Sequence, residues 1–166
     1  MKVLRVTLDT NIPYRWFENH KEQVIFEELL DWQTKGAIEI VVTRTILKDV
    51  PREPYRTKVQ NLPELDVKIV GTVFRLDESF LDGPDMLGSR KFKAFEKKLR
   101  SEFPDMKEPN QNDLDHIHAH LLNERDVFLT FEKAILNLQE RIQSELEVCI
   151  QHPEEFLRSI RGESNS

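Results

Sequence analysis

Short apolar runs alternate with amphipathic stretches along this chain, and their alternation predicts a repeated order of strand and helix. The runs at 3–8, 37–42 and 127–130 are short and rich in β-branched residues, which is typical of buried strands. Between them, apolar residues recur every three or four positions, which is typical of helices that bury one face. Such an order predicts a three-layer α/β/α sandwich around a central, mainly parallel sheet.

The same patterns, together with glycine and proline, set the expected boundaries. Gly36 and Pro51 each end a helix, Gly71 marks a bend or bulge, and Gly83 with Pro84 marks a loop. We expect one domain over 1–161 and a flexible tail over 162–166. The expected strands are 3–8, 37–42, 67–74, 127–130 and 148–150, and the expected helices are 19–34, 43–50, 89–103, 113–123, 132–144 and 154–160.

Length and composition indicate a single globular domain of an intracellular type. The chain has 166 residues, of which 33% are charged and 39% hydrophobic. No apolar run approaches the roughly 18 residues of a transmembrane helix, and the N-terminus lacks a signal peptide, so we expect a cytoplasmic protein without membrane contact. Cys149, the single cysteine, is expected to be a small buried residue in a strand, with no internal disulfide.

The net charge of −6 argues against bulk electrostatic coating of nucleic acid, but the cations are unevenly placed. They concentrate in the expected helix 89–103, whose apolar stripe consists of Phe92, Phe95, Leu99 and Phe103. This helix is a candidate to hold a phosphate backbone, and the alternative is an ordinary solvated helix face. Its cations are Arg90, Lys91, Lys93, Lys97, Lys98 and Arg100.

Acidic residues recur at the end of expected strands or at the start of the helices that follow. Asp9 directly follows the first strand, and the others are Asp49, Asp113 with Asp115, and Glu132. In a parallel sheet these strand ends share one edge, so the acids could converge. Converging carboxylates need a compensating cation, and oxygen ligands suit Mg²⁺ or Mn²⁺. Asp113 fits a helix cap at least equally well.

The segment 113–120 also carries three alternating histidines, which is typical of some zinc hydrolases. Alternating side chains meet on a strand or loop, whereas on a helix His118 points away from His116 and His120. The apolar spacing of the segment favours a helix, so we expect partly exposed helix histidines near the acids. A pair formed by His116 and His120 remains an alternative zinc site.

Five segments, 8–11, 43–50, 113–120, 126–133 and 152–157, resemble the successive motifs of PIN domains. The resemblance implies metal-dependent cleavage of RNA within an α/β/α sandwich. It makes Asp9 the first metal ligand, and it places Asp49 where the family usually has Glu. Glu132 stands where the family usually has Asp. By the same resemblance, Asn11 and Thr130 are polar supports, and the third acid is Asp115 or Asp113, with Asp115 preferred.

The resulting hypothesis is an endoribonuclease whose acids hold one or two Mg²⁺ or Mn²⁺ ions that activate water. Single-stranded DNA is an alternative substrate. Many small members of the family are toxins of toxin–antitoxin pairs, so an antitoxin partner and a homodimer are further expectations. The competing hypothesis is a non-catalytic PIN-like binding module.

Overall fold

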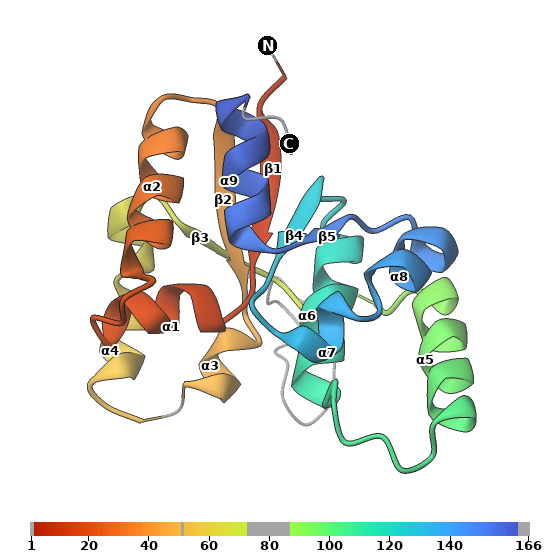
Figure 1. Cartoon of the computed structure of the whole chain (residues 1–166). Coiled ribbons are helices and arrows are strands. Elements are labelled where there is room, and N and C mark those ends of the chain that lie inside the picture. The colour runs from red at the N-terminus through yellow and green to blue at the C-terminus, as the bar shows by residue number, and fades with distance from the viewer. Residues whose placement is uncertain (1, 51, 73–86, 163–166) are drawn as a thin grey trace.

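A five-stranded sheet forms the centre of the protein, as seen in a computed structural model that describes residues 2–50, 52–72 and 87–162. The strand order is β3-β2-β1-β4-β5, and every neighbouring pair is parallel (Figure 1). The chain therefore builds the sheet outward from β1 in one direction and then, from β4, in the other. The strands are β1 (Leu4–Leu8), β2 (Ile38–Thr43), β3 (Lys68–Val70), β4 (Val127–Leu129) and β5 (Ile150–Gln151).

Helices cover both faces of this sheet, so the expected three-layer α/β/α architecture is confirmed (Figure 1). One layer contains α1 (Asn11–Phe17), α2 (Gln23–Thr34) and α9 (Pro153–Arg161). The other contains α5 (Arg90–Glu102), α6 (Gln111–Leu122), α7 (Lys133–Leu136) and α8 (Gln139–Leu146). After β2 the chain forms α3 (Ile46–Asp49), α4 (Tyr55–Gln60) and the 3-10 helix η1 (Leu62–Leu65).

Successive side chains along each strand face opposite sides of the sheet, so the hydrophobic core consists of two clusters, one on each side. Val6 and Leu8 of β1 pack in the cluster shared with α1, α2 and α9, whereas Phe128 of β4 packs in the cluster shared with α5, α6 and α8. Thr7, between Val6 and Leu8, points to the second side, because successive strand residues face opposite ways. Threonine hydroxyls thus lie inside the protein on the side of α6.

Several boundaries differ from the expectations. The helices α1 and α4 and the 3-10 helix η1 were not expected from the local pattern; they are stabilised by tertiary burial of residues such as Phe17, Val59 and Leu62. The expected helix 132–144 is two helices, α7 and α8. Gly36 does follow α2, with a φ of +73° that glycine adopts without strain. The expectations for Pro51, 73–74, Gly83–Pro84 and the tail beyond 162 lie outside the described residues.

The stripe on α5 is core, with one correction. Phe92, Phe95 and Leu99 are buried, but Phe103 follows the last residue of the helix and is 51% exposed. Cys149 directly precedes β5 and is half-buried, and burial raises the pKa of its thiol. Within the described ranges, no helix combines the length and the apolar character needed to cross a membrane.

Candidate functional site

Asp9 lies where the central strand ends, between β1 and β4. The two strands pair in register with Leu8 opposite Leu129, so the residues that follow them are neighbours. Thr130 Oγ1 donates to Asp9 Oδ2 over 2.5 Å, Asn11 Nδ2 donates to the same oxygen over 3.0 Å, and the Thr10 N–H donates to Oδ1 over 2.8 Å. Open α/β sheets bind ligands at such a point, where the strand order reverses.

The Asp9 carboxylate is only 4% exposed, and its environment affects its charge. Burial raises the pKa of Asp9 above its ordinary value, although the charge of His116 and the hydrogen bond from Thr130 act in the opposite direction. Asn11 and Thr130, the two expected supports, thus contact Asp9 directly. A buried carboxylate with a raised pKa is stabilised by any nearby cation.

Asp49, the last residue of α3, is held by three polar side chains. Its Oδ2 accepts from Thr10 Oγ1 over 2.5 Å and from His116 Nε2 over 2.7 Å, and its Oδ1 accepts from Asn112 Nδ2 over 2.8 Å. Burial by itself would raise the pKa of Asp49, but these hydrogen bonds and the charge of His116 outweigh it and lower the pKa. The Asp49 side chain remains 21% exposed, so it borders solvent.

His116 joins the two acids from the side of α6. Its Nδ1 lies 2.6 Å from Thr43 Oγ1, and its Nε2 lies 2.7 Å from Asp49 Oδ2 and 4.0 Å from Asp9 Oδ1. Burial by itself would lower the pKa of His116, but the hydrogen bond to Asp49 and the nearby carboxylate charges raise it. A protonated ring donates from both nitrogens, which suits a threonine oxygen on one side and a carboxylate on the other.

Asp113 takes part in the capping box at the start of α6, and the charge of Asp9 affects its pKa. It exchanges reciprocal hydrogen bonds with Asn110 in a capping box, as the cap interpretation of the sequence predicted. Burial, followed by the charges of Asp9 and Glu108, raises the pKa of Asp113 to about 7, against a hydrogen bond from the Asn110 backbone that lowers it. Asp113 and His116 are three residues apart and therefore share one face of α6.

The remaining two acids lie differently. Asp115 is 4% exposed and accepts from Gln111 Nε2 over 3.0 Å, on a different side of α6 from Asp113. The Glu132 carboxylate accepts from the Ala134 N–H over 3.2 Å and thereby caps α7. His116 thus links Asp49 to Asp9, and the charge of Asp9 acts on Asp113, whereas Asp115 and Glu132 have hydrogen-bond partners of their own.

The three alternating histidines do not converge. His116 reaches Asp49, His120 Nδ1 lies 2.9 Å from Thr7 Oγ1, and His118 stacks on Phe92 with its Nε2 accepting from the Ser89 N–H. The divergence of His118 agrees with the helical expectation. All three are buried rather than partly exposed, because α6 lies between the sheet and α5.

Charge and donor chemistry at the strand ends fit a divalent cation, but the ligands are not preassembled. Raised pKa values at Asp9 and Asp113 identify carboxylates whose negative charge is poorly compensated, and oxygen donors suit Mg²⁺ or Mn²⁺. Over the described ranges, no three or more His, Cys, Asp or Glu side chains are already grouped to hold a metal ion. Side chains at the site would have to turn to bind one.

The expected basic surface lies on α5, at the outer side of the second helical layer and away from α1 to α4 (Figure 1). Several of its cations pair with acids on exposed surface. Such pairs contribute little stability, so they do not prevent contact with another anion. The pairs are Lys91 with Glu147 at 2.7 Å, Lys98 with Glu145 at 3.4 Å and Arg100 with Glu96 at 3.3 Å.

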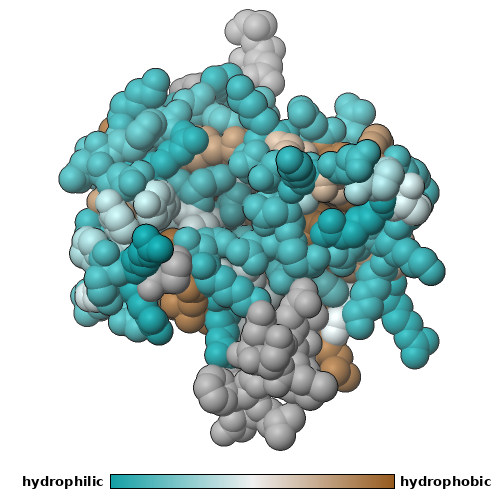
Figure 2. Space-filling view, turned by 90° about the horizontal axis from the view of Figure 1, so that it is seen from below, coloured by the Kyte–Doolittle hydropathy of each residue, from teal (hydrophilic) through white to brown (hydrophobic). Residues whose placement is uncertain are grey.

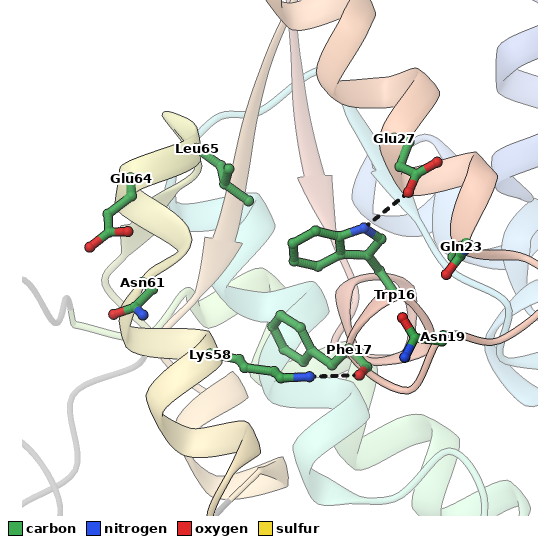
Figure 3. A pocket seen from close by; sticks show the side chains of 9 residues that line it. All are labelled: Trp16, Phe17, Asn19, Gln23, Glu27, Lys58, Asn61, Glu64 and Leu65. Carbon is green, nitrogen blue, oxygen red and sulfur yellow. Dashed lines mark hydrogen bonds between the residues drawn. The ribbon is translucent and has the colours of Figure 1, made fainter.

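The surface seen along the strands from their carboxyl ends is mostly hydrophilic, with small separated hydrophobic areas (Figure 2). A cavity of about 410 Å³ lies elsewhere, between α1, α2, α4 and η1. Trp16 and Phe17 line it together with Lys58, whose Nζ donates to the Phe17 carbonyl over 2.8 Å (Figure 3). None of the five candidate acids lines this cavity.

No protein-family model matches this chain, and no curated protein matches it. Among solved structures, the chain is similar to a chain of VapBC2 from Rickettsia felis, crystallised bound to a DNA fragment from their promoter. The TM-score is 0.50 and the identity 13%, and the alignment covers 90% of this chain and 98% of that chain. The fold is PIN-like. At this identity the likeness concerns the fold.

In this PIN-like fold, three polar residues contact Asp49 without having been identified as its partners from sequence patterns: Thr10, Asn112 and His116. A fourth such residue, Thr43, contacts His116. Thr10 lies just after β1 and Thr43 ends β2, and a threonine at the end of a strand does not by itself indicate a side-chain partner. The one usable signal was spacing, because Asp113, His116 and His120 recur at three and four residues and share a face of α6.

Proposed function

We propose that this protein is a divalent-metal-dependent endoribonuclease whose site lies at the carboxyl ends of β1 and β2. The observation that supports the proposal is that His116 lies 2.7 Å from Asp49 and 4.0 Å from Asp9 in a PIN-like fold, with the charge of Asp9 also acting on Asp113. Asp9 is buried and its charge contributes to the raised pKa of Asp113. Such a site has a strong electrostatic preference for a cation.

Asp9, Asp49 and Asp113 would hold Mg²⁺ or Mn²⁺, with Asp115 and Glu132 as the further expected acids. The ion would supply a water of lowered pKa and stabilise charge on the phosphodiester. Thr130 and Asn11 hold Asp9 in one orientation through their hydrogen bonds. We infer Asp113 as the third acid, because the charge of Asp9 contributes to its raised pKa.

The cations of α5 would bind the phosphate backbone of RNA. The neighbouring fold comes from a structure named VapBC2, in which the protein pair is bound to promoter DNA. We therefore include in the proposal that the chain is the toxin of a toxin–antitoxin pair and binds a small antitoxin. A homodimer and cleavage of single-stranded DNA remain part of the hypothesis to be tested.

The decisive experiment is cleavage of a fluorescent single-stranded RNA with Mn²⁺, Mg²⁺ or EDTA, by wild type and by Asp9→Asn. A single-stranded DNA of the same sequence runs in parallel. Asp31→Asn, a change of an exposed acid on α2, is the matched control. We expect metal-dependent RNA cleavage that Asp9→Asn reduces at least a hundredfold and Asp31→Asn leaves within twofold.

Thermal melts in EDTA check that Asp9→Asn is folded, and Asp49→Asn serves as a second variant if it is not. Added Mn²⁺ should raise the melting temperature of wild type, because a ligand that binds only the folded state stabilises it. Undiminished cleavage by a folded Asp9→Asn protein would overturn the assignment of Asp9. No cleavage and no Mn²⁺ shift in wild type would overturn the proposed nuclease.

A second candidate function, a non-catalytic binding module, is favoured by two observations. The described acids are not grouped as a ready metal site, and Glu132 is engaged in capping α7. This candidate predicts that wild type binds labelled RNA equally well in Mn²⁺ and in EDTA and cleaves it in neither.

A further inference from the structure

His116 connects four segments that come from three separate regions of the sequence. It projects from α6, is 0% exposed, and contacts the end of β2 through Thr43, α3 through Asp49 and the turn after β1 through Thr10. The contact to Thr43, at 2.6 Å, fixes the ring, so that Nε2 is directed at the acids. Partners that orient a ligand from behind commonly determine the affinity of a metal site.

The position of Asp49 depends on contacts outside its own helix. The helix α3 has four residues, and its N-cap residue Thr45 makes no side-chain capping hydrogen bond. A single turn of helix has little stability of its own, so tertiary hydrogen bonds must hold the Asp49 carboxylate. His116 supplies the one such bond that comes from a fully buried side chain among the described contacts of Asp49.

The two carboxylates also repel each other, since the charge of Asp49 disfavours ionisation of Asp9. The His116 Nε2 atom lies 2.7 Å from one and 4.0 Å from the other. The imidazole therefore offsets the repulsion that would otherwise drive the partly exposed Asp49 toward solvent.

We propose that His116 is a positioning residue of the acidic site, which holds Asp49 beside Asp9 by linking it to the ends of β1 and β2. The proposal rests on the proposed function, because it assigns His116 a role in the same metal site. His116 acts through Asp49 and makes no contact with substrate in this role.

The chain provides a matched control on the same helix. His118 is buried like His116, two residues further along α6, but it stacks on Phe92 with ring centroids 4.1 Å apart. Replacing either histidine with phenylalanine removes a buried imidazole from α6 and adds similar apolar volume. His116→Gln retains an N–H donor for Asp49 and completes the set.

The experiment measures Mn²⁺ affinity by electron paramagnetic resonance and the kcat and KM of RNA cleavage for wild type, His116→Phe, His116→Gln and His118→Phe. We expect His116→Phe to weaken Mn²⁺ binding and lower kcat at least tenfold, with KM changed less than threefold. His116→Gln should recover both to within threefold of wild type. His118→Phe should keep Mn²⁺ affinity and kcat within twofold of wild type, even if its melting temperature falls as much as that of His116→Phe.

Near-normal Mn²⁺ affinity and kcat in His116→Phe would overturn the proposal. So would equal losses in the Gln and Phe variants, because loss of stability alone would then explain both. If wild type neither binds Mn²⁺ nor cleaves RNA, the proposed function fails instead.

A cycle of His116→Phe and Asp49→Asn in urea unfolding tests the pairing without any metal. We expect the unfolding constant of the double variant to depart at least threefold from the product of the single effects. In the same cycle with His118→Phe in place of His116→Phe, the unfolding constant of the double variant should equal the product of the single effects. If the effects of the His116 and Asp49 changes on the unfolding constant simply multiply, the proposed interaction between these two side chains is wrong.

Discussion

Thr130 donates a 2.5 Å hydrogen bond to the buried carboxylate of Asp9 across 121 positions of the chain. The bond joins the residues that follow β1 and β4, the two neighbouring strands at which the strand order reverses. Thr130 also accepts from the Glu132 N–H over 2.9 Å, so one hydroxyl connects the acid after β1 to the start of α7.

Replacing Thr130 with valine removes this donor at nearly constant volume. We expect the free energy of unfolding to fall by about 1.5–3 kcal/mol, as for hydrogen bonds to charged groups. Urea unfolding at pH 7.5 measures it. Thr34→Val, which removes an exposed hydroxyl bonded to the Leu30 carbonyl, should cost under about 0.5 kcal/mol. Equal effects of both changes would show that Asp9 gains nothing from Thr130.

The raised pKa of Asp113, at about 7, predicts that metal affinity depends on pH. A protonated carboxyl must lose its proton to bind an ion, so Mn²⁺ affinity should fall up to about tenfold per pH unit below pH 7. Asp113→Asn should bind more weakly at pH 8 and lose most of this dependence, while its amide oxygen still accepts from the Asn110 N–H. Asp115→Asn is the comparison; if Asp115→Asn, and not Asp113→Asn, loses the dependence, the choice of acid is wrong.

His120 predicts a loss of stability in acid. Burial lowers its pKa to about 3, and its Nε2 has no hydrogen-bond partner among the described residues. Because the folded pKa lies below the unfolded value of about 6.5, the contribution is complete above pH 6.5 and decreases as the pH falls toward 3. Between pH 6.5 and 4.5 wild type should lose about 2–3 kcal/mol more than His120→Asn. Urea unfolding at both pH values provides the comparison, and parallel losses would contradict the buried neutral ring.

Charge reversal on α5 tests the proposed RNA-binding surface. Changing Lys93, Lys97 and Lys98 to Glu should weaken RNA binding and reduce the slope of log affinity against log salt by about 1 for each phosphate that the variant no longer binds. Fluorescence anisotropy over a salt series measures both. The matched control is the same change at three exposed lysines elsewhere, Lys21, Lys35 and Lys68. Equal binding by both triple variants at low salt would exclude α5 as the RNA surface.

Much of the fold was predictable because hydrophobic spacing reports local burial. The strands β1, β2 and β4 and the helices α2, α5, α6 and α9 follow from spacing and from markers such as Gly36. In contrast, α1 and α4 are short, and tertiary contacts stabilise them. The division of 132–144 into α7 and α8 likewise has no clear marker in the sequence.

The sequence by itself determined which residue types occur at the strand ends, since strand and helix periodicity places five acids near one edge of a parallel sheet: Asp9, Asp49, Asp113, Asp115 and Glu132. Only the tertiary structure decided how these acids relate. The strand order brings Thr130 to Asp9, and the seating of α6 against the sheet directs His116 to Asp49 and His118 to Phe92. Local periodicity specifies which face of an element is buried, whereas the hydrogen-bond partner of a buried polar group depends on elements far away in the chain.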